Sequence, residues 1–118
     1  MVIGPNKEEN MKRKVDVCQE ITSRRITEPD ALARIASTHA DLATRHIAVQ
    51  HITDPAVLER IAVSNSEPST RKVAILMIAD TDVLAQIAIT DKNRWVRETA
   101  FWQFQALTQE TEQGGLEK

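Results

Sequence analysis

Three arginines recur at one spacing along the chain, and their chemistry is easy to define. Arg45, Arg71 and Arg97 follow one another at intervals of 26 positions. A guanidinium group is always charged, and its N–H donors form a fork that fits a carboxylate or a phosphate. Such a row could bind a phosphate backbone or an acidic partner. It could also be structural, with each Arg paired to a polar residue four positions earlier or to a capping Asp of an adjacent unit. Because the spacing is that of an internal repeat, we favour the structural role.

The remaining basic residues raise the question of nucleic-acid binding. Acidic residues are interspersed among them, and the net charge of the chain is −2. Aromatic residues, on which bases could stack, are absent from the first 94 positions. Nucleic-acid or phosphate binding is therefore an alternative and not the main prediction. The basic residues in question are Lys12, Arg13, Lys14, Arg24, Arg25, Lys72, Lys92 and Arg94.

Histidine, cysteine and hydroxyl groups do not form a recognisable catalytic or metal-binding pattern. His46 and His51 are five positions apart, whereas two ligands on one helix face need a separation of four. His39 and the single Cys18 do not complete a ligand set with them. One Cys also excludes an intramolecular disulfide, which favours a reducing, cytoplasmic setting. The sequence predicts no enzyme activity, no cofactor and no metal.

All four aromatic residues lie close together near the C-terminus. Phe101 and Phe104 fall in apolar columns of the repeat and are predicted to be core residues. Trp95 and Trp102 fall outside these columns, so they either close the end of the array or contact a partner. Tryptophan is common at binding hot spots because it buries a large area at low entropic cost. Leu76 and Met77, also outside the core columns, extend this hypothetical partner-binding surface.

The elements that position these residues must be helical. The chain has 118 residues, 42% of them hydrophobic and 27% charged, which suits one folded domain. Its three glycines are Gly4, Gly114 and Gly115, so none lies between residues 5 and 113. Hairpin turns and phosphate-binding loops need glycine inside the chain, and both are nearly excluded. No apolar stretch is long enough to span a membrane, and no secretory signal is expected at the start.

An internal repeat of 26 residues organises the sequence. Leu32-Ala33-Arg34-Ile35-Ala36 returns as Leu58-Glu59-Arg60-Ile61-Ala62 and as Leu84-Ala85-Gln86-Ile87-Ala88. The pattern of each unit predicts two helices of about ten residues, joined by a polar link. The first helix is expected to begin after an acidic N-cap residue, usually with Pro as its first residue. Helices this short need neighbours for stability. We predict a tail at 1–9, one repeat domain at 10–109 and a frayed tail at 110–118. The domain comprises a half-unit at 10–26 and units at 27–52, 53–78 and 79–104.

These columns resemble short bacterial HEAT-like repeats, including the leucine-rich-repeat variant proteins. The resemblance lies in Asp54-Pro55-Ala56-Val57-Leu58-Glu59-Arg60-Ile61-Ala62 and in Trp95-Val96-Arg97-Glu98-Thr99-Ala100, and it covers about residues 26–104. Glu28 and Thr81 depart from the Asp-Pro pair of the pattern. The resemblance implies a right-handed α-α superhelix with a binding or scaffolding role and without catalytic residues of its own.

The sequence therefore predicts an all-α solenoid of stacked antiparallel helix pairs, with about seven helices. Its predicted function is that of a cytoplasmic protein-interaction module, scaffold or adaptor. Two alternatives stay open: phosphate or nucleic-acid binding through basic residues of the second helices, and a regulatory subunit of an enzyme. The expected partner is another protein, with self-association as a further option and no membrane contact.

Overall fold

The computed structural model describes residues 17–116, and it describes side chains as far as Gln109. Within this range the chain forms helices and loops without a strand, which confirms the predicted all-α class. Residues 1–16 and 117–118, including the predicted tail at 1–9, lie outside the described range. After a helical segment at 17–22, the helices are α2 (Pro29–Thr38), α3 (Leu42–Gln50), α4 (Pro55–Ser64), α5 (Pro68–Ile75), α6 (Thr81–Thr90) and α7 (Arg94–Leu116). The chain divides between Ile52 and Thr53 into two units.

Acidic residues stand at the N-cap of the first helix in each pair, as the repeat predicts. The Asp54 carboxylate accepts a hydrogen bond from the Ala56 amide at 3.0 Å, and the Asp80 carboxylate accepts one from the Asp82 amide at 3.0 Å. These bonds satisfy amides that a helix leaves without partners in its first turn. Glu28 also occupies the N-cap of α2, but its side chain makes no capping hydrogen bond with the described residues. Glu28 and Asp54 thus share a position but not a capping contact.

The three polar links share one local geometry. Each link begins with a residue whose side chain accepts a hydrogen bond from the amide two positions later. These bonds are Asp41 N to His39 Nδ1 (3.0 Å), Glu67 N to Asn65 Oδ1 (2.9 Å) and Asn93 N to Asp91 Oδ1 (2.8 Å). Such side chain–backbone bonds make tight turns without glycine. This explains how helix can follow helix in a chain with a glycine-free interior.

The first unit is built around α2 and α3, which pack on each other. Its core consists of fully buried apolar side chains from the helical segment at 17–22, from α2 and α3, and from the residues that follow α3. The Cys18 Sγ atom lies 3.3 Å from the Thr44 Oγ1 atom, which links the first helical segment to α3. The main core residues are Ile21, Leu32, Ala36, Ala48, Val49 and Ile52.

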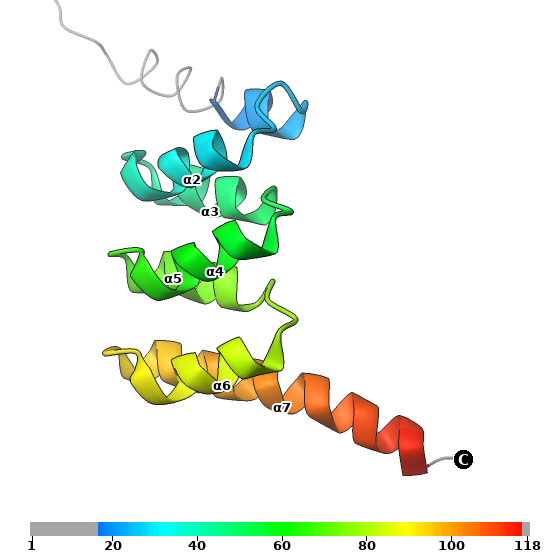
Figure 1. Cartoon of the computed structure of the whole chain (residues 1–118). Helices are drawn as coiled ribbons and strands as arrows, with labels where there is room; N and C mark the ends of the chain where they lie inside the picture. The colour runs from blue at the N-terminus through cyan, green and yellow to red at the C-terminus, as the bar shows by residue number, and fades with distance from the viewer. Residues whose placement is uncertain (1–16, 117–118) are drawn as a thin grey trace, which may run out of the picture. The chain divides into compact units, whose positions relative to one another are not determined.

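The second unit holds two helix pairs, α4 with α5 and α6 with α7, and α5 also packs against α7. Figure 1 shows the α4–α5 pair, in green, and the α6–α7 pair, in yellow to red, as successive layers of this unit. Each layer buries apolar side chains from the same repeat columns, as stacked helix pairs must. Fully or almost fully buried are Leu58, Ala62, Ala74, Ile75, Leu84, Val96 and Ala100.

The last helix departs from the sequence prediction in two respects. Phe101 was predicted to be a core residue, but 46% of its surface is exposed. Ile75 occupies the same repeat column and is buried, because the α6–α7 pair follows α5. No described helix follows α7, which carries Phe101. Helix α7 also continues to Leu116, past Glu110, where a frayed tail is predicted. The residues from Gln105 to Gln113 contain no proline or glycine, so local propensity does not end the helix before Gly114.

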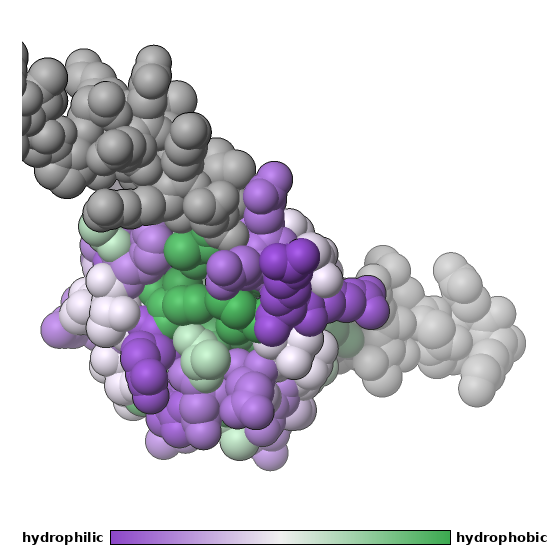
Figure 2. Space-filling view, turned by 90° about the horizontal axis from the view of Figure 1, so that it is seen from above, coloured by the Kyte–Doolittle hydropathy of each residue, from purple (hydrophilic) through white to green (hydrophobic). Residues whose placement is uncertain are grey.

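The surface is mixed in polarity. Figure 2 shows hydrophobic side chains gathered at the middle of the face seen from above, with hydrophilic side chains around them. None of the helices within residues 17–116 is long and apolar enough to cross a membrane.

Candidate protein-binding surface

Arg71, the middle residue of the arginine row, is part of the core. Only 2% of its side chain is exposed. Its Nε and Nη2 atoms donate to the two carboxylate oxygens of Asp91 at 2.9 and 3.1 Å, and its Nη1 atom donates to the Asn65 carbonyl at 2.6 Å. Glu67, four positions before Arg71, accepts instead from the Ser69 amide as the N-cap of α5. Arg71 therefore joins successive helix pairs and cannot reach a phosphate in solution.

The two outer arginines of the row differ from Arg71. Arg97 is half-buried, and its Nη1 atom donates to the Asp91 carbonyl at 2.6 Å. Arg45 is also half-buried, and its Nε atom is buried without a hydrogen-bond partner among the described residues. The row is therefore not a stripe of equally exposed cations, which a phosphate backbone would require.

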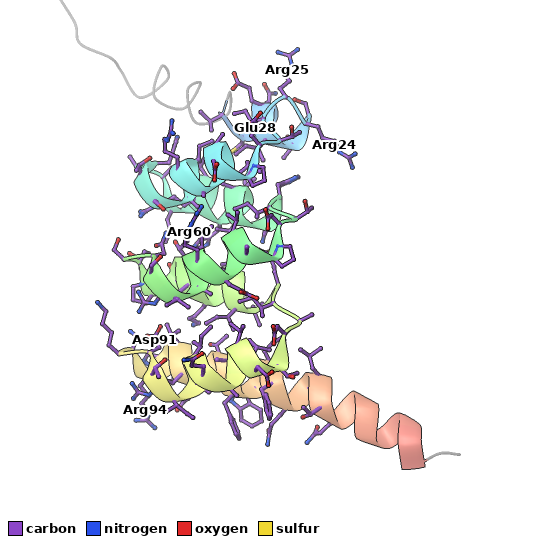
Figure 3. The ribbon with its side chains drawn as sticks, in the orientation of Figure 1. Arg24, Arg25, Glu28, Arg60, Asp91 and Arg94 are labelled. Carbon is purple, nitrogen blue, oxygen red and sulfur yellow. The ribbon has the colours of Figure 1, made fainter. Side chains whose placement is uncertain are left out.

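Of the other basic residues, Arg24 and Arg25 belong to the first unit, whereas Lys72, Lys92 and Arg94 belong to the second. Arg24 and Arg25 point outward from the loop after the first helical segment (Figure 3). Arg94 donates to Glu98 at 3.1 Å in an exposed pair on α7, which partly neutralises it. Lys12, Arg13 and Lys14 lie outside the described residues.

The histidines and the cysteine have structural contacts. His39 ends α2, and its Nδ1 atom accepts from the Asp41 amide. His51 ends α3, and Cys18 contacts Thr44. Within residues 17–109, no three His, Cys, Asp or Glu side chains are grouped so that they could hold a metal ion.

Trp95 and Trp102 are both highly exposed on α7. Each leaves 64% of its surface in solvent. Seven residues correspond to almost two full turns, so the two rings lie on the same side of the helix. The Arg94 guanidinium carbon lies 5.9 Å from the centroid of the Trp95 ring. The Trp102 and Phe101 rings pack edge to face, with 5.9 Å between their centroids. Both rings thus have a neighbour that orients them while they stay accessible.

Leu76, which follows α5, is also exposed, with 58% of its surface in solvent. The Gln103 side chain donates to the carbonyls of Leu76 and Ile78 at 3.3 and 3.4 Å. Because Gln103 follows Trp102, these bonds bring the end of α5 beside the part of α7 that holds Trp102. We call Trp95, Trp102 and Leu76 the tryptophan surface.

Met77 has a different environment from Leu76. It is half-buried and lines a cleft of about 520 Å³ with Leu58, Ile78 and the loop before α6. Of the four residues predicted to bind a partner, Met77 is thus the least accessible. The prediction grouped it with Leu76 because both lie outside the core columns, but neighbours in a helical segment point in different directions.

The sequence analysis missed two exposed apolar residues on the first helices of the second unit. Val63 on α4 and Ile89 on α6 are 63% and 79% exposed. They share one repeat column, and the corresponding residue of the first unit is Ser37. That polar residue was the signal that the column faces solvent.

Comparisons of the chain with protein-family models, curated proteins and solved structures find no match. The function is therefore argued from the residues of this chain.

Proposed function

We propose that this chain is a protein-interaction module, built of HEAT-like repeats and without catalytic activity of its own, that binds a partner through the tryptophan surface. The observation that carries this proposal is the exposure of Trp95 and Trp102, each 64%, on one side of α7. Exposed tryptophan rings leave a large apolar area in water, and a partner that covers them gains the hydrophobic free energy of that area. Large exposed apolar patches are typical of interaction sites.

The surroundings of the two rings support the same proposal. The Arg94 guanidinium lies beside the Trp95 ring and the Phe101 ring beside the Trp102 ring, and in this proposal these contacts favour the exposed orientation of both rings. A partner therefore loses less conformational entropy in ordering them. Leu76 adds an apolar contact from a second element. Two aromatic anchors with a neighbouring aliphatic residue resemble the centre of a binding hot spot.

The proposal is tested by affinity capture from native lysate followed by measurement of the affinity of the captured partner. We expect Trp95→Ala/Trp102→Ala to weaken binding by at least about 30-fold, because hot-spot truncations cost about 2 kcal/mol or more. The matched control is Val63→Ala/Ile89→Ala, which removes exposed apolar groups from another surface of the same unit. This control should bind as the wild type does. A tryptophan double variant with wild-type affinity for the same partner would refute the proposal.

A further inference from the structure

The end of the α6–α7 pair repeats the end of the α4–α5 pair, but no described helix pair follows it. Arg71 donates through Nη1 to the Asn65 carbonyl and through Nε and Nη2 to the Asp91 carboxylate of the next pair. Arg97 makes the equivalent Nη1 bond, to the Asp91 carbonyl at the same length of 2.6 Å. Among the described residues, however, no carboxylate bonds to Nε or Nη2 of Arg97. Among the described residues, the carbonyl half of the Arg71 interaction is therefore reproduced and the carboxylate half is not.

The apolar columns around the two arginines show the same difference. Ala62 is fully buried, but Ala88 is only half-buried. Ile75 is fully buried, whereas the corresponding Phe101 is 46% exposed. Ile78 is likewise buried, whereas Phe104, the next residue of its column, is half-buried. We call Ala88, Arg97, Phe101 and Phe104 the end face.

We propose that the end face binds a helical segment of a partner protein that presents an Asp or Glu at its helix C-terminus to Arg97. The Arg71–Asp91 pair is the template for this contact, since Asp91 is the residue that ends α6. The partner carboxylate would accept from Nε and Nη2 of Arg97, and apolar side chains of the same helix would cover Phe101. This inference rests on the proposed function of protein binding, and it adds a second surface and the chemistry of the partner.

A second copy of this chain does not supply that chemistry. Stacked head to tail, its first full unit would bring His39, which is not a carboxylate, to the position that Asp91 holds in the last unit. Stacked end face to end face, it would offer a second Arg97 and no carboxylate from the end face. Like charges at a partly desolvated contact are unfavourable. The charge of the end face therefore selects a different, acidic partner.

The test uses the helix pair that presents Asp91 to Arg71 in this structure. The probe is a fluorescein-labelled peptide of residues 79–104, which carries α6, the link with Asp91 and the start of α7. Its affinity for the full chain is measured by fluorescence anisotropy, with the peptide at nanomolar concentration. We expect saturable binding that Asp91→Asn in the peptide weakens by about tenfold or more, because hydrogen bonds to charged groups contribute at least that much.

Variants of the full chain show which of its residues contact the peptide. Arg97→Gln should bind the wild-type peptide about tenfold more weakly and should no longer distinguish it from the Asp91→Asn peptide. Phe101→Ser should weaken both peptides equally, and Trp95→Ala should leave both affinities unchanged. Each chain variant is checked for wild-type helicity by circular dichroism.

Any of three binding results would overturn the inference: no saturable binding, equal affinity of the two peptides for the wild-type chain, or undiminished discrimination by the Arg97→Gln chain. A larger mass of the chain alone, reversed by Phe101→Ser, would identify a second copy as the occupant and would also overturn it. Failure of this inference can be distinguished from failure of the proposed function. The proposed function is tested with the captured partner and the Trp95→Ala/Trp102→Ala variant, whereas the peptide tests only the end face.

Discussion

Arg71 and Asp91 form a bidentate ion pair across two successive helix pairs. The Nε–Oδ2 and Nη2–Oδ1 distances are 2.9 and 3.1 Å, and the two side chains are 2% and 5% exposed. The Asp91 Oδ1 atom also accepts from the Asn93 amide, so one carboxylate shapes a link and holds the preceding pair. Burial of both charges is favourable only because their hydrogen bonds are made.

Replacement of Asp91 by Asn should destabilise the second unit strongly. The amide keeps one oxygen for the Asn93 amide, but it leaves the buried Arg71 charge without an opposite charge. Removing one partner of a buried pair costs about 3–5 kcal/mol. We expect a fall of that order in the free energy of unfolding, measured by urea denaturation followed by circular dichroism.

The control for this prediction is Glu98→Gln, which removes the charge from the exposed Arg94–Glu98 pair on α7. The side chains of that pair are 76% and 42% exposed. Exposed pairs contribute about 1 kcal/mol or less. If Asp91→Asn and Glu98→Gln changed stability equally, the buried pair would not have the structural role assigned to it.

Thr44 and Thr70 occupy one repeat column and are both fully buried, but only one hydroxyl is satisfied. Thr44 Oγ1 donates to the Asp41 carboxylate at 2.7 Å, whereas Thr70 Oγ1 has no hydrogen-bond partner among the described residues. Valine replaces the hydroxyl by a methyl group of similar size. We expect Thr44→Val to lower the free energy of unfolding by about 1–2 kcal/mol and Thr70→Val to leave it unchanged or raise it. Denaturant titration of the two variants in parallel checks this, and a larger loss for Thr70→Val would contradict it.

The helices and links could be predicted from sequence because their causes are local and recur. Asp54 and Asp80 cap helices through their own first-turn amides, and Asn65 and Asp91 turn the chain through amides two positions later. Three aligned copies of such signals make the element boundaries clear.

Exposure at the ends of the repeat could not be predicted in the same way. Phe101 shares its column with buried Ile75, but no described helix pair follows α7, and Phe101 is 46% exposed. A column specifies what a residue contacts when a neighbour is present, so it is least informative in the last unit. The tryptophan residues could be singled out because they break the columns, but their exposure depends on tertiary packing.

Arg24 is a second feature that the sequence does not show. Its φ angle is 65°, the left-handed conformation that glycine adopts at helix ends. This geometry lets the Arg25 and Ile26 amides both donate to the Glu20 carbonyl, at 2.8 and 3.0 Å. Because residues 5–113 contain no glycine, nothing in the composition marks this left-handed position.

Arg24→Gly should therefore stabilise the chain. Relief of the left-handed strain exceeds the entropic cost of glycine, and we expect a gain of about 0.5–1 kcal/mol in the free energy of unfolding. Arg25→Gly is the matched control: this neighbour does not have a positive φ angle, so glycine should cost about 0.5–1 kcal/mol there. Thermal denaturation of the two variants should show shifts of opposite sign, and shifts of the same sign would argue against strain at Arg24.

Trp95 and Trp102 should be dispensable for folding, which makes them suitable for testing binding. Because both rings are mostly in solvent, Trp95→Ala and Trp102→Ala should each lower the free energy of unfolding by less than about 1 kcal/mol. Val96→Ala, at the fully buried residue between them, should cost about 2 kcal/mol because it removes two core methyl groups. Acrylamide should quench the fluorescence of both tryptophans in the wild-type chain. Shielded fluorescence, or a stability loss at Trp102 as large as at Val96, would assign the rings to the fold and remove them as candidates for a binding surface.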